Sequence, residues 1–159
     1  VPLLIAVVAT VIALATFLVA SDAAAYGGTA SETCNNCHVM NPMYENYYHA
    51  AHQRAAECAD CHLPHENVVA YYFEKGRQGA HDVYVFTTGT TPELIRANEH
   101  SQEIIQSNCI RCHEETVESI VMGAQPFDRN CWDCHRSVAH GERGMSTSPL
   151  QDSAIYPVK

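Results

Sequence analysis

Basic residues are scarce in this chain, and the shortage restricts its possible partners. Nine lysines and arginines stand against eighteen aspartates and glutamates, which gives a formal net charge of -9. Its lysines are Lys75 and Lys159 alone. Because a surface with this charge repels phosphate groups, the composition argues against nucleic acid or anionic lipid as a partner.

Charged residues are absent from the first twenty-one positions. Residues 1–20 are apolar apart from Pro2, Thr10 and Thr16. A helix of that length spans about 30 Å, which is the thickness of a bilayer's hydrocarbon core. We therefore expect residues 1–21 to form a retained transmembrane helix; the alternative is a signal peptide cleaved near the small residues Ala23–Ala25.

Convincing strand patterns are also lacking, and the chain is expected to be mainly α with coil. A helix over Asn67–Arg77 opens with a capping residue, and Gly76 and Gly79 are expected to loosen the chain at its end. A second helix is expected from Pro92 towards Ser107, because proline favours the first helical position. The short apolar stretch 83–86 is open to an extended conformation.

Cysteine is absent outside one motif, Cys-x-x-Cys-His, which occurs four times. Two thiols three positions apart can each add to a vinyl group of one haem, and the adjacent histidine can bind the iron. Disulfides or zinc ribbons would use the cysteines but do not need the histidine. The sequence therefore predicts four covalently bound haem c groups. The attaching cysteines are Cys34, Cys37, Cys58, Cys61, Cys109, Cys112, Cys131 and Cys134.

The haem sites also indicate a compartment and a domain order. Haem c is attached outside the bacterial cytoplasm, so we expect the haem domain in the periplasm and the N-terminus in the cytoplasm, with one pass through the inner membrane. Four haems would fill most of the interior of so small a domain. The expected parts are the helix 1–21, a tetrahaem domain 22–141 with dihaem halves 30–66 and 105–141 around an insert 67–104, and an irregular tail 142–159.

Each haem iron has two axial positions, so the four haems need eight ligands. The motif histidines, His38, His62, His113 and His135, are the default four. Any single one of the others is more commonly a surface or second-layer residue than a ligand. These others are His49, His52, His65, His81, His100 and His140.

Several segments around the motifs resemble one known family. They are Cys-His-Val-Met at 37–40, His52 ahead of the second motif, Cys-His-Leu-Pro-His at 61–65 and Cys-His-Arg-Ser-Val-Ala-His-Gly at 134–141. With the N-terminal anchor they resemble the NapC/NirT family of tetrahaem quinol dehydrogenases. Within it, the chain is most similar to the small membrane subunit of cytochrome c nitrite reductase. The resemblance covers residues 1–141.

The resemblance implies axial ligands for the third and fourth haems. It pairs His140 with His113 on the third haem and His52 with His135 on the fourth. On the second haem it leaves His62 without an obvious partner. It implies that a lysine of the catalytic reductase subunit fills that position, with His49 and His65 as the rival donors.

For the first haem the resemblance implies an unusual ligand. The methionine two positions after the motif histidine, Met40, takes the place of His38. Met43 is a second candidate, and either methionine could instead fill a gap in the core. Methionine ligation tends to raise the potential of a haem, which suits acceptance of electrons from a quinol.

The resemblance also implies a quinol site beside the first haem, where the anchor meets the haem domain. Lys75 would contact the quinol, and Asp82 would lie near the open face of the iron and accept a proton. The aromatic cluster 71–73 suits a membrane interface, although it could equally pack on porphyrin.

The expected function is oxidation of menaquinol and transfer of its electrons to a periplasmic reductase, above all the pentahaem nitrite reductase that forms ammonia. The terminal reduction belongs to that partner. One alternative is service to a nitrate, fumarate or N-oxide reductase. Another is an anchored carrier that receives electrons from a protein instead of a quinol. A third alternative is a haem-based sensor. It is disfavoured because a sensor does not need four haems and no output domain is visible in the sequence.

Overall fold

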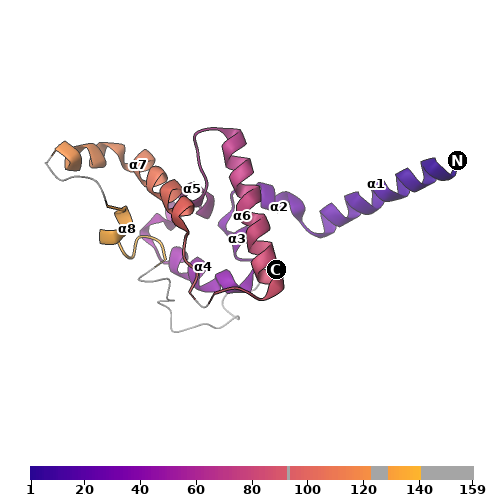
Figure 1. Cartoon of the computed structure of the whole chain (residues 1–159), viewed down its shortest axis with the longest axis horizontal. Coiled ribbons are helices and arrows are strands. Elements are labelled where there is room, and N and C mark those ends of the chain that lie inside the picture. The colour runs from indigo at the N-terminus through magenta and orange to yellow at the C-terminus, as the bar shows by residue number, and fades with distance from the viewer. Residues whose placement is uncertain (93, 123–128, 141–159) are drawn as a thin grey trace.

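The computed structural model describes residues 1–92, 94–122 and 129–140 (Figure 1). This part of the chain contains helices and coil and no strand, which confirms the expected fold class. The helices are α1 (Pro2–Ala20), α2 (Ala23–Gly27), α3 (Ser31–Cys34), η1 (His38–Met40), α4 (Asn41–Tyr48), η2 (Ala51–Arg54), α5 (Cys58–His62), α6 (Val68–Thr88), α7 (Glu99–Met122) and α8 (Cys131–Cys134), where η1 and η2 are 3-10 helices. The expected tail 142–159 lies outside the described residues.

Helix α1 extends away from the rest of the molecule (Figure 1). It carries no charge, none of its residues is buried, and its mean hydropathy is 2.9. Its 19 residues reach about 28 Å at the usual rise of an α-helix. By length and composition α1 can therefore cross a membrane, as expected for residues 1–21.

Two haem motifs form short helices for the same local reason. In α5 and α8 the residue before the last cysteine is an aspartate, Asp60 or Asp133, at the third helical position. Its side chain accepts a hydrogen bond from the backbone N–H of the capping residue, Glu57 or Asn130, whose own side chain accepts one in return. Such a capping box satisfies amide groups that a helix start leaves free.

Helix α6 is longer than the sequence predicted. Asn67 caps it by accepting a hydrogen bond from the backbone N–H of Ala70 at 2.8 Å, and it ends at Gly89, whose φ of 67° is left-handed. The expected end near Gly76 and Gly79 is wrong, and the stretch 83–86 is helical, not extended. Two glycines cost about 1 kcal/mol each inside a helix, which the cap and the packing of the inner face outweigh.

Helix α7 begins later than predicted. Pro92 precedes a non-helical stretch, and the helix starts at Glu99, after Asn98. The Asn98 side chain accepts a hydrogen bond from the backbone N–H of Ser101 at 2.9 Å, so asparagine provides a strong start signal close to the helix. The helix contains the third haem motif and is kinked at His113, which has non-helical angles.

The hydrophobic core is very small. Among the described residues, the buried hydrophobic side chains are Tyr47, Leu63 and Ile104. Polar residues are buried at least as often: Ser31, Glu45, Asn46, Glu74 and Asn108. Three apolar side chains cannot stabilise a domain of this size, which fits a fold whose interior is occupied mostly by large prosthetic groups.

Candidate functional site

The thiols of the four motifs lie beside one another in chain order. A hydrogen bond between the Cys34 and Cys58 thiols raises the pKa of Cys34 and lowers that of Cys58 to about 7. Burial raises the pKa of Cys61, with smaller contributions from Asp60 and then the nearby Cys112. The motifs therefore adjoin from first to second and from second to third.

The third motif adjoins the fourth in the same way. Burial raises the pKa of Cys109 to about 12, and the next contribution comes from the neighbouring Cys131. Gln106 of α7 accepts a hydrogen bond from the Cys131 backbone N–H at 2.9 Å, which holds α8 against α7. The structure thus arranges the four attachment sites in a series.

Buried polar side chains hold this series together. Asn108 of α7 donates to the carbonyls of Cys61 and Leu63, at 3.0 and 2.8 Å, and so joins the third motif to the second. Ser31 donates to Glu57 and accepts from the Cys58 backbone N–H at 2.9 Å, which joins the first motif to the second. Neither Asn108 nor Ser31 was predicted from the sequence, which contains no signal for such cross-links.

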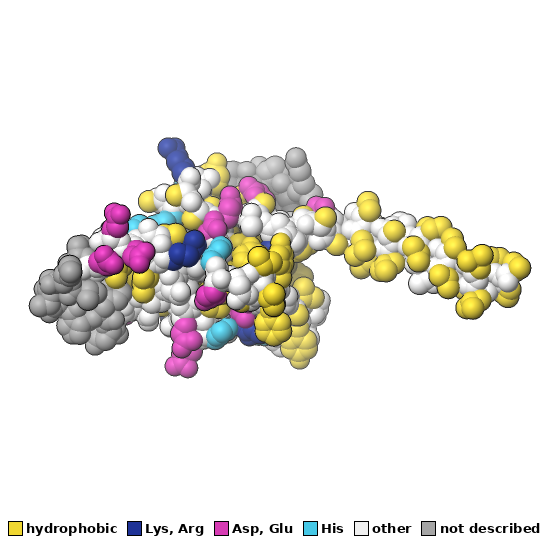
Figure 2. Space-filling model, turned by 90° about the horizontal axis from the view of Figure 1, so that it is seen from above, with side chains coloured by type: hydrophobic (Ala, Val, Ile, Leu, Met, Phe, Trp, Pro, Cys, Tyr) yellow, Lys and Arg dark blue, Asp and Glu magenta, His cyan; other side chains and the backbone are white. Residues whose placement is uncertain are grey.

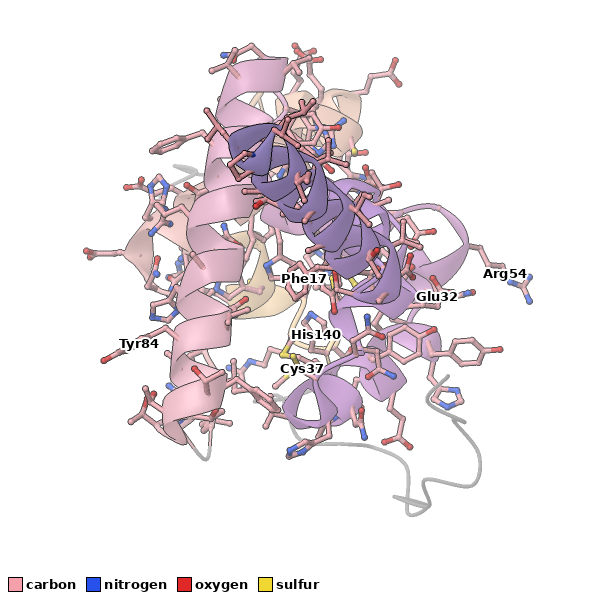
Figure 3. All side chains as sticks on the ribbon, turned by 90° about the vertical axis from the view of Figure 1, so that its right-hand side faces the viewer. Phe17, Glu32, Cys37, Arg54, Tyr84 and His140 are labelled. Atoms are coloured by element: carbon pink, nitrogen blue, oxygen red, sulfur yellow. The ribbon has the colours of Figure 1, made fainter. Side chains whose placement is uncertain are left out.

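The ring of His140 lies beside the second motif histidine. The centroids of His62 and His140 are 6.0 Å apart. Burial lowers the pKa of both imidazoles, that of His62 to about 4, so both are neutral and able to bind a metal. His140 Nδ1–H donates to the Met43 carbonyl at 3.0 Å, and Asn46 donates to the His140 carbonyl at 2.9 Å. Figure 3 shows His140 inside the body of the molecule.

The ring of His52 lies beside the third motif histidine. The centroids of His52 and His113 are 6.1 Å apart. His52 Nδ1–H donates to the Val138 carbonyl at 3.3 Å. In both pairs, a backbone carbonyl therefore binds one nitrogen of the added histidine and leaves the other nitrogen free for a metal.

These ring neighbours differ from the axial-ligand pairs expected from the sequence, and as ligand pairs the expected ones stay predictions. His140 was expected with His113, and His52 with His135. The physical reason is that the bonds of His140 to α4 and of His52 to Val138 fold the C-terminal end back onto the first half of the chain. Within residues 1–92, 94–122 and 129–140, no other histidine ring lies against the exposed His135.

The rival donors for the second haem lie elsewhere. His49 is exposed and contacts the ring of Tyr48 at 5.7 Å. His65 lies 5.6 Å from the ring of Tyr71 and 3.9 Å from the Asp60 carboxylate. His140, and neither of these, is the histidine found against His62.

The candidate ligands of the first haem, Met40, Met43 and His38, all lie near the first motif, and the structure does not select one of them. Met40 ends η1 and Met43 lies in α4, and both are half-buried. The ring of His38 stands edge-to-face against Phe86 of α6 at 5.5 Å. Met40 as the ligand of the first haem stays a prediction.

Lys75 and Asp82 both lie near the first motif, two helical turns apart on α6. The charge of Lys75 lowers and that of Asp82 raises the pKa of the Cys34 thiol, after larger contributions from Cys58 and burial. The Lys75 ammonium donates to the Gly28 carbonyl, just beyond α2, and lies 5.8 Å from the centre of the Tyr71 ring. Lys75 therefore lies at the end of the domain next to α1, and the role of Lys75 and Asp82 in a quinol site stays a prediction.

The residues present fit covalently attached haem. Two imidazoles that bind one metal from opposite sides at about 2 Å have centroids about 6 Å apart, as in both histidine pairs. Asn35 Oδ1 and the Tyr71 hydroxyl are buried near the first motif without hydrogen-bond partners among the described residues. A prosthetic group with polar edges could supply those partners.

Two other uses of the cysteines do not fit the structure. All eight cysteines are free, so the chain forms no disulfide framework. In the part of the chain that was described, no three side chains of histidine, cysteine, aspartate or glutamate gather as a metal site. A structural zinc ion would need four such ligands together.

Comparison with known proteins agrees with this geometry. The model of the NapC/NirT cytochrome c family, N-terminal region, matches residues 1–145. The cytochrome c-type protein NrfH of Wolinella succinogenes is 35% identical over 150 residues, which are 88% of this chain and 85% of that protein. The cytochrome c nitrite reductase subunit NrfH of Nitratidesulfovibrio vulgaris is 35% identical over 120 residues, 75% of this chain and 73% of that protein.

A solved structure is similar over nearly the whole length. It is the crystal structure of a cytochrome c nitrite reductase NrfHA complex bound to the HQNO inhibitor. The TM-score is 0.63, the identity is 33%, and the match covers 94% of both chains.

The apolar helix, the series of attachment motifs and these relatives define a membrane-anchored c-type cytochrome with covalently bound haem. More closely, the chain belongs to the NapC/NirT cytochrome c family.

Proposed function

We propose that this chain oxidises menaquinol at the membrane and passes the electrons through four covalently bound haem c groups to a periplasmic nitrite reductase that forms ammonia. Its relatives named NrfH, and the complex that contains one of them, support that partner. The N-terminus would lie in the cytoplasm, because haem c is attached on the other side of the membrane.

The observation that carries the proposal is the series of attachment sites. Ser31 links the first motif to the second, Asn108 the second to the third, and Gln106 the third to the fourth. When bound, haem supplies one-electron transfer at each site. The chain's own contribution is to hold the sites in order, from the end next to α1 to the end at α8 (Figure 1).

The first site would receive the quinol. Oxidation of a quinol releases two electrons and two protons, so the site needs a proton acceptor and a group that holds the ring oxygen. The Asp82 side chain is 77% exposed and can accept a proton, and the Lys75 ammonium can hold the oxygen. The charges of both affect the pKa of the Cys34 thiol of the first motif, and Lys75 reaches the Gly28 carbonyl where the chain leaves α2.

The axial ligands that we propose follow the ring pairs of the structure. His62 and His140 would bind the second iron, and His113 and His52 the third. Met40 would bind the first. The fourth iron would have His135 from this chain, and the catalytic subunit would provide its other ligand. This proposal therefore assigns the partner's ligand to the fourth haem, whereas the resemblance implied the second.

The quinol site is tested by replacing its two polar side chains. Lys75→Met and Asp82→Asn should each lower reduction by a menaquinol analogue at least about 100-fold, with normal haem content, because general acid–base groups contribute rates of this order. Lys75→Arg, which keeps the charge, should retain more activity than Lys75→Met. Arg96→Met removes an exposed positive charge from the loop before α7 and should change nothing.

Unimpaired turnover in both variants would contradict the quinol site. If the unaltered haem-loaded chain were not reduced by the menaquinol analogue but accepted electrons from a protein donor, the anchored-carrier alternative would replace the proposal.

A further inference from the structure

Helix α6 buries one carboxylate and exposes a row of large apolar side chains, which is unusual for a helix of a water-soluble domain. Glu74, on the side facing the body, is 4% exposed. On the outer side Val69, Phe73 and Val83 are 79%, 72% and 61% exposed. In a helix surrounded by water the apolar stripe faces the core and the charged residues face outwards. We therefore expect the exposed apolar side of α6 to contact an apolar neighbour outside the domain.

We define the outer face of α6 by its members, which recur at helical spacing on one side. They are Val69, Tyr72, Phe73, Gly76, Ala80, Val83 and Tyr84. An added Cβ on Gly76 meets nothing within 4 Å, so the described part of the chain leaves the middle of the face uncovered. Figure 3 shows Tyr84 pointing away from the other helices.

The attachment motifs lie on the other side of α6. Gln78 donates to the His62 carbonyl at 3.2 Å, and the charge of Lys75 lowers the pKa of the Cys34 thiol. Groups attached at those motifs therefore contact the inner side of the helix, and the outer face needs a different neighbour.

Helix α6 lies next to the membrane anchor, which it approaches through Lys75 on its inner side. Lys75, halfway along α6, donates to the carbonyl of Gly28, eight residues after the end of α1 at Ala20. Figure 1 shows α6 running across the direction of α1, on the side of the domain from which α1 leaves. In Figure 2 hydrophobic side chains gather at that same end.

We propose that α6 lies in the surface of the bilayer that α1 crosses, with its outer face inserted among the lipid headgroups and upper acyl chains. Tyr72 and Tyr84 suit this depth, because amphipathic rings are favoured at the membrane interface. The helix would hold the first motif and Lys75 at a fixed height above the hydrocarbon. The proposal needs only the membrane anchor, and it does not depend on which donor the chain oxidises.

The insertion is driven by apolar contact and not by charge. The chain has a net charge of -9, and on α6 Arg77 is already paired with Glu74. An interfacial helix that relied on anionic lipid would carry lysines and arginines along its polar face. Neutral lipid should therefore be sufficient.

The test uses single added cysteines, since the native thiols are consumed by haem attachment. Val69→Cys, Phe73→Cys and Val83→Cys are compared with Glu115→Cys, an exposed position on α7. The full haem-loaded chain is placed singly in nanodiscs of phosphatidylcholine, or of phosphatidylcholine and phosphatidylglycerol in equal parts. The reaction of each thiol with a charged, membrane-impermeant maleimide is then timed.

The three outer-face thiols should react at least about tenfold more slowly than Glu115→Cys in both lipids, because a thiol in apolar surroundings is less ionised and out of reach of the reagent. After denaturation all four should react at equal rates. Lys75→Met should leave the protection unchanged, so loss of the quinol site and loss of the membrane contact can be told apart.

Outer-face rates within about twofold of the control in nanodiscs would overturn the proposal. Protection that appears only after the catalytic subunit is added would make this face a protein interface, and would overturn it as well.

Discussion

At the scale of single residues, two backbone carbonyls decide which histidines meet. The Met43 carbonyl accepts from His140 at 3.0 Å, and the Val138 carbonyl accepts from His52 at 3.3 Å. Each bond selects one tautomer and leaves the other ring nitrogen free. Which histidine rings lie together therefore depends on which carbonyl each histidine reaches, and not on its distance in sequence from a motif.

The histidine pairs can be tested with alanine variants. His52→Ala and His140→Ala should each convert one low-spin haem to high spin, because each would leave an iron with one strong ligand. In a chain without the third haem, made by Cys109→Ser with Cys112→Ser, His52→Ala should have no further effect, whereas His140→Ala should still convert one haem. Electron paramagnetic resonance counts the centres.

A further conversion by His52→Ala in that background would contradict the pair with His113. It would restore the pair with His135 that was expected from the sequence.

The attachment sites could be predicted from the sequence because their signal is local. Two cysteines and a histidine within five positions are sufficient to define a haem site. The pairing of His62 with His140 could not be predicted, because it joins residues far apart in the chain and rests on carbonyl groups that every residue possesses. Lys75 and Asp82 were predicted as quinol-site residues by resemblance; their charges affect the pKa of the Cys34 thiol, and their role stays a prediction.

At the scale of elements, contacts outside a helix outweigh its local propensities. Gly76 and Gly79 do not end α6, since the helix is capped at Asn67 and its inner face is bound to the domain. Pro92 does not start α7, since Asn98, directly before the first helical residue Glu99, provides a better cap. Local signals predicted that two helices exist in this insert, but not where they begin and end.

Glu74 joins these two helices. Its carboxylate accepts from Arg77 at 2.5 Å and from Gln78 at 2.8 Å on α6, and it lies 3.4 Å from His100 on α7. Hydrogen bonding, first from Arg77, lowers the pKa of the carboxyl from 4.5 to about 2. The buried carboxylate is thus held in its charged form.

This carboxylate predicts a pH-dependent stability. The lowered pKa of Glu74 stabilises the fold above pH 4.5, and that contribution is lost as the pH falls towards 2. It should amount to about 1–3 kcal/mol, since Arg77 remains partly in solvent. Glu74→Gln should therefore lower the denaturation midpoint in guanidinium at pH 7, and the difference from the unaltered chain should shrink between pH 4.5 and 2.

Glu115→Gln, at an exposed position of α7, is the matched control and should show no such difference. A Glu74→Gln midpoint equal to that of the unaltered chain at neutral pH would show that the carboxylate does not stabilise the contact.

At the scale of the whole molecule, the two ends differ in the way that directional electron transfer requires. The end next to α1 carries Lys75 and Asp82 beside the first motif. The opposite end carries α8 and the exposed His135 (Figure 1). Between them the described core has three buried apolar side chains, so the attached cofactors must provide much of the interior.

The exposed end predicts where the catalytic subunit binds. If the partner completes the fourth haem, the haem-loaded chain alone should contain one more high-spin haem than the complex, and titration with the subunit should remove that signal at one subunit per chain. A chain without the second haem, made by Cys58→Ser with Cys61→Ser, should keep this change if His140, whose ring lies beside His62, completes that site. If the subunit still bound but the change disappeared, the foreign ligand would belong to the second haem and the ring pair of His62 and His140 would not be a ligand pair.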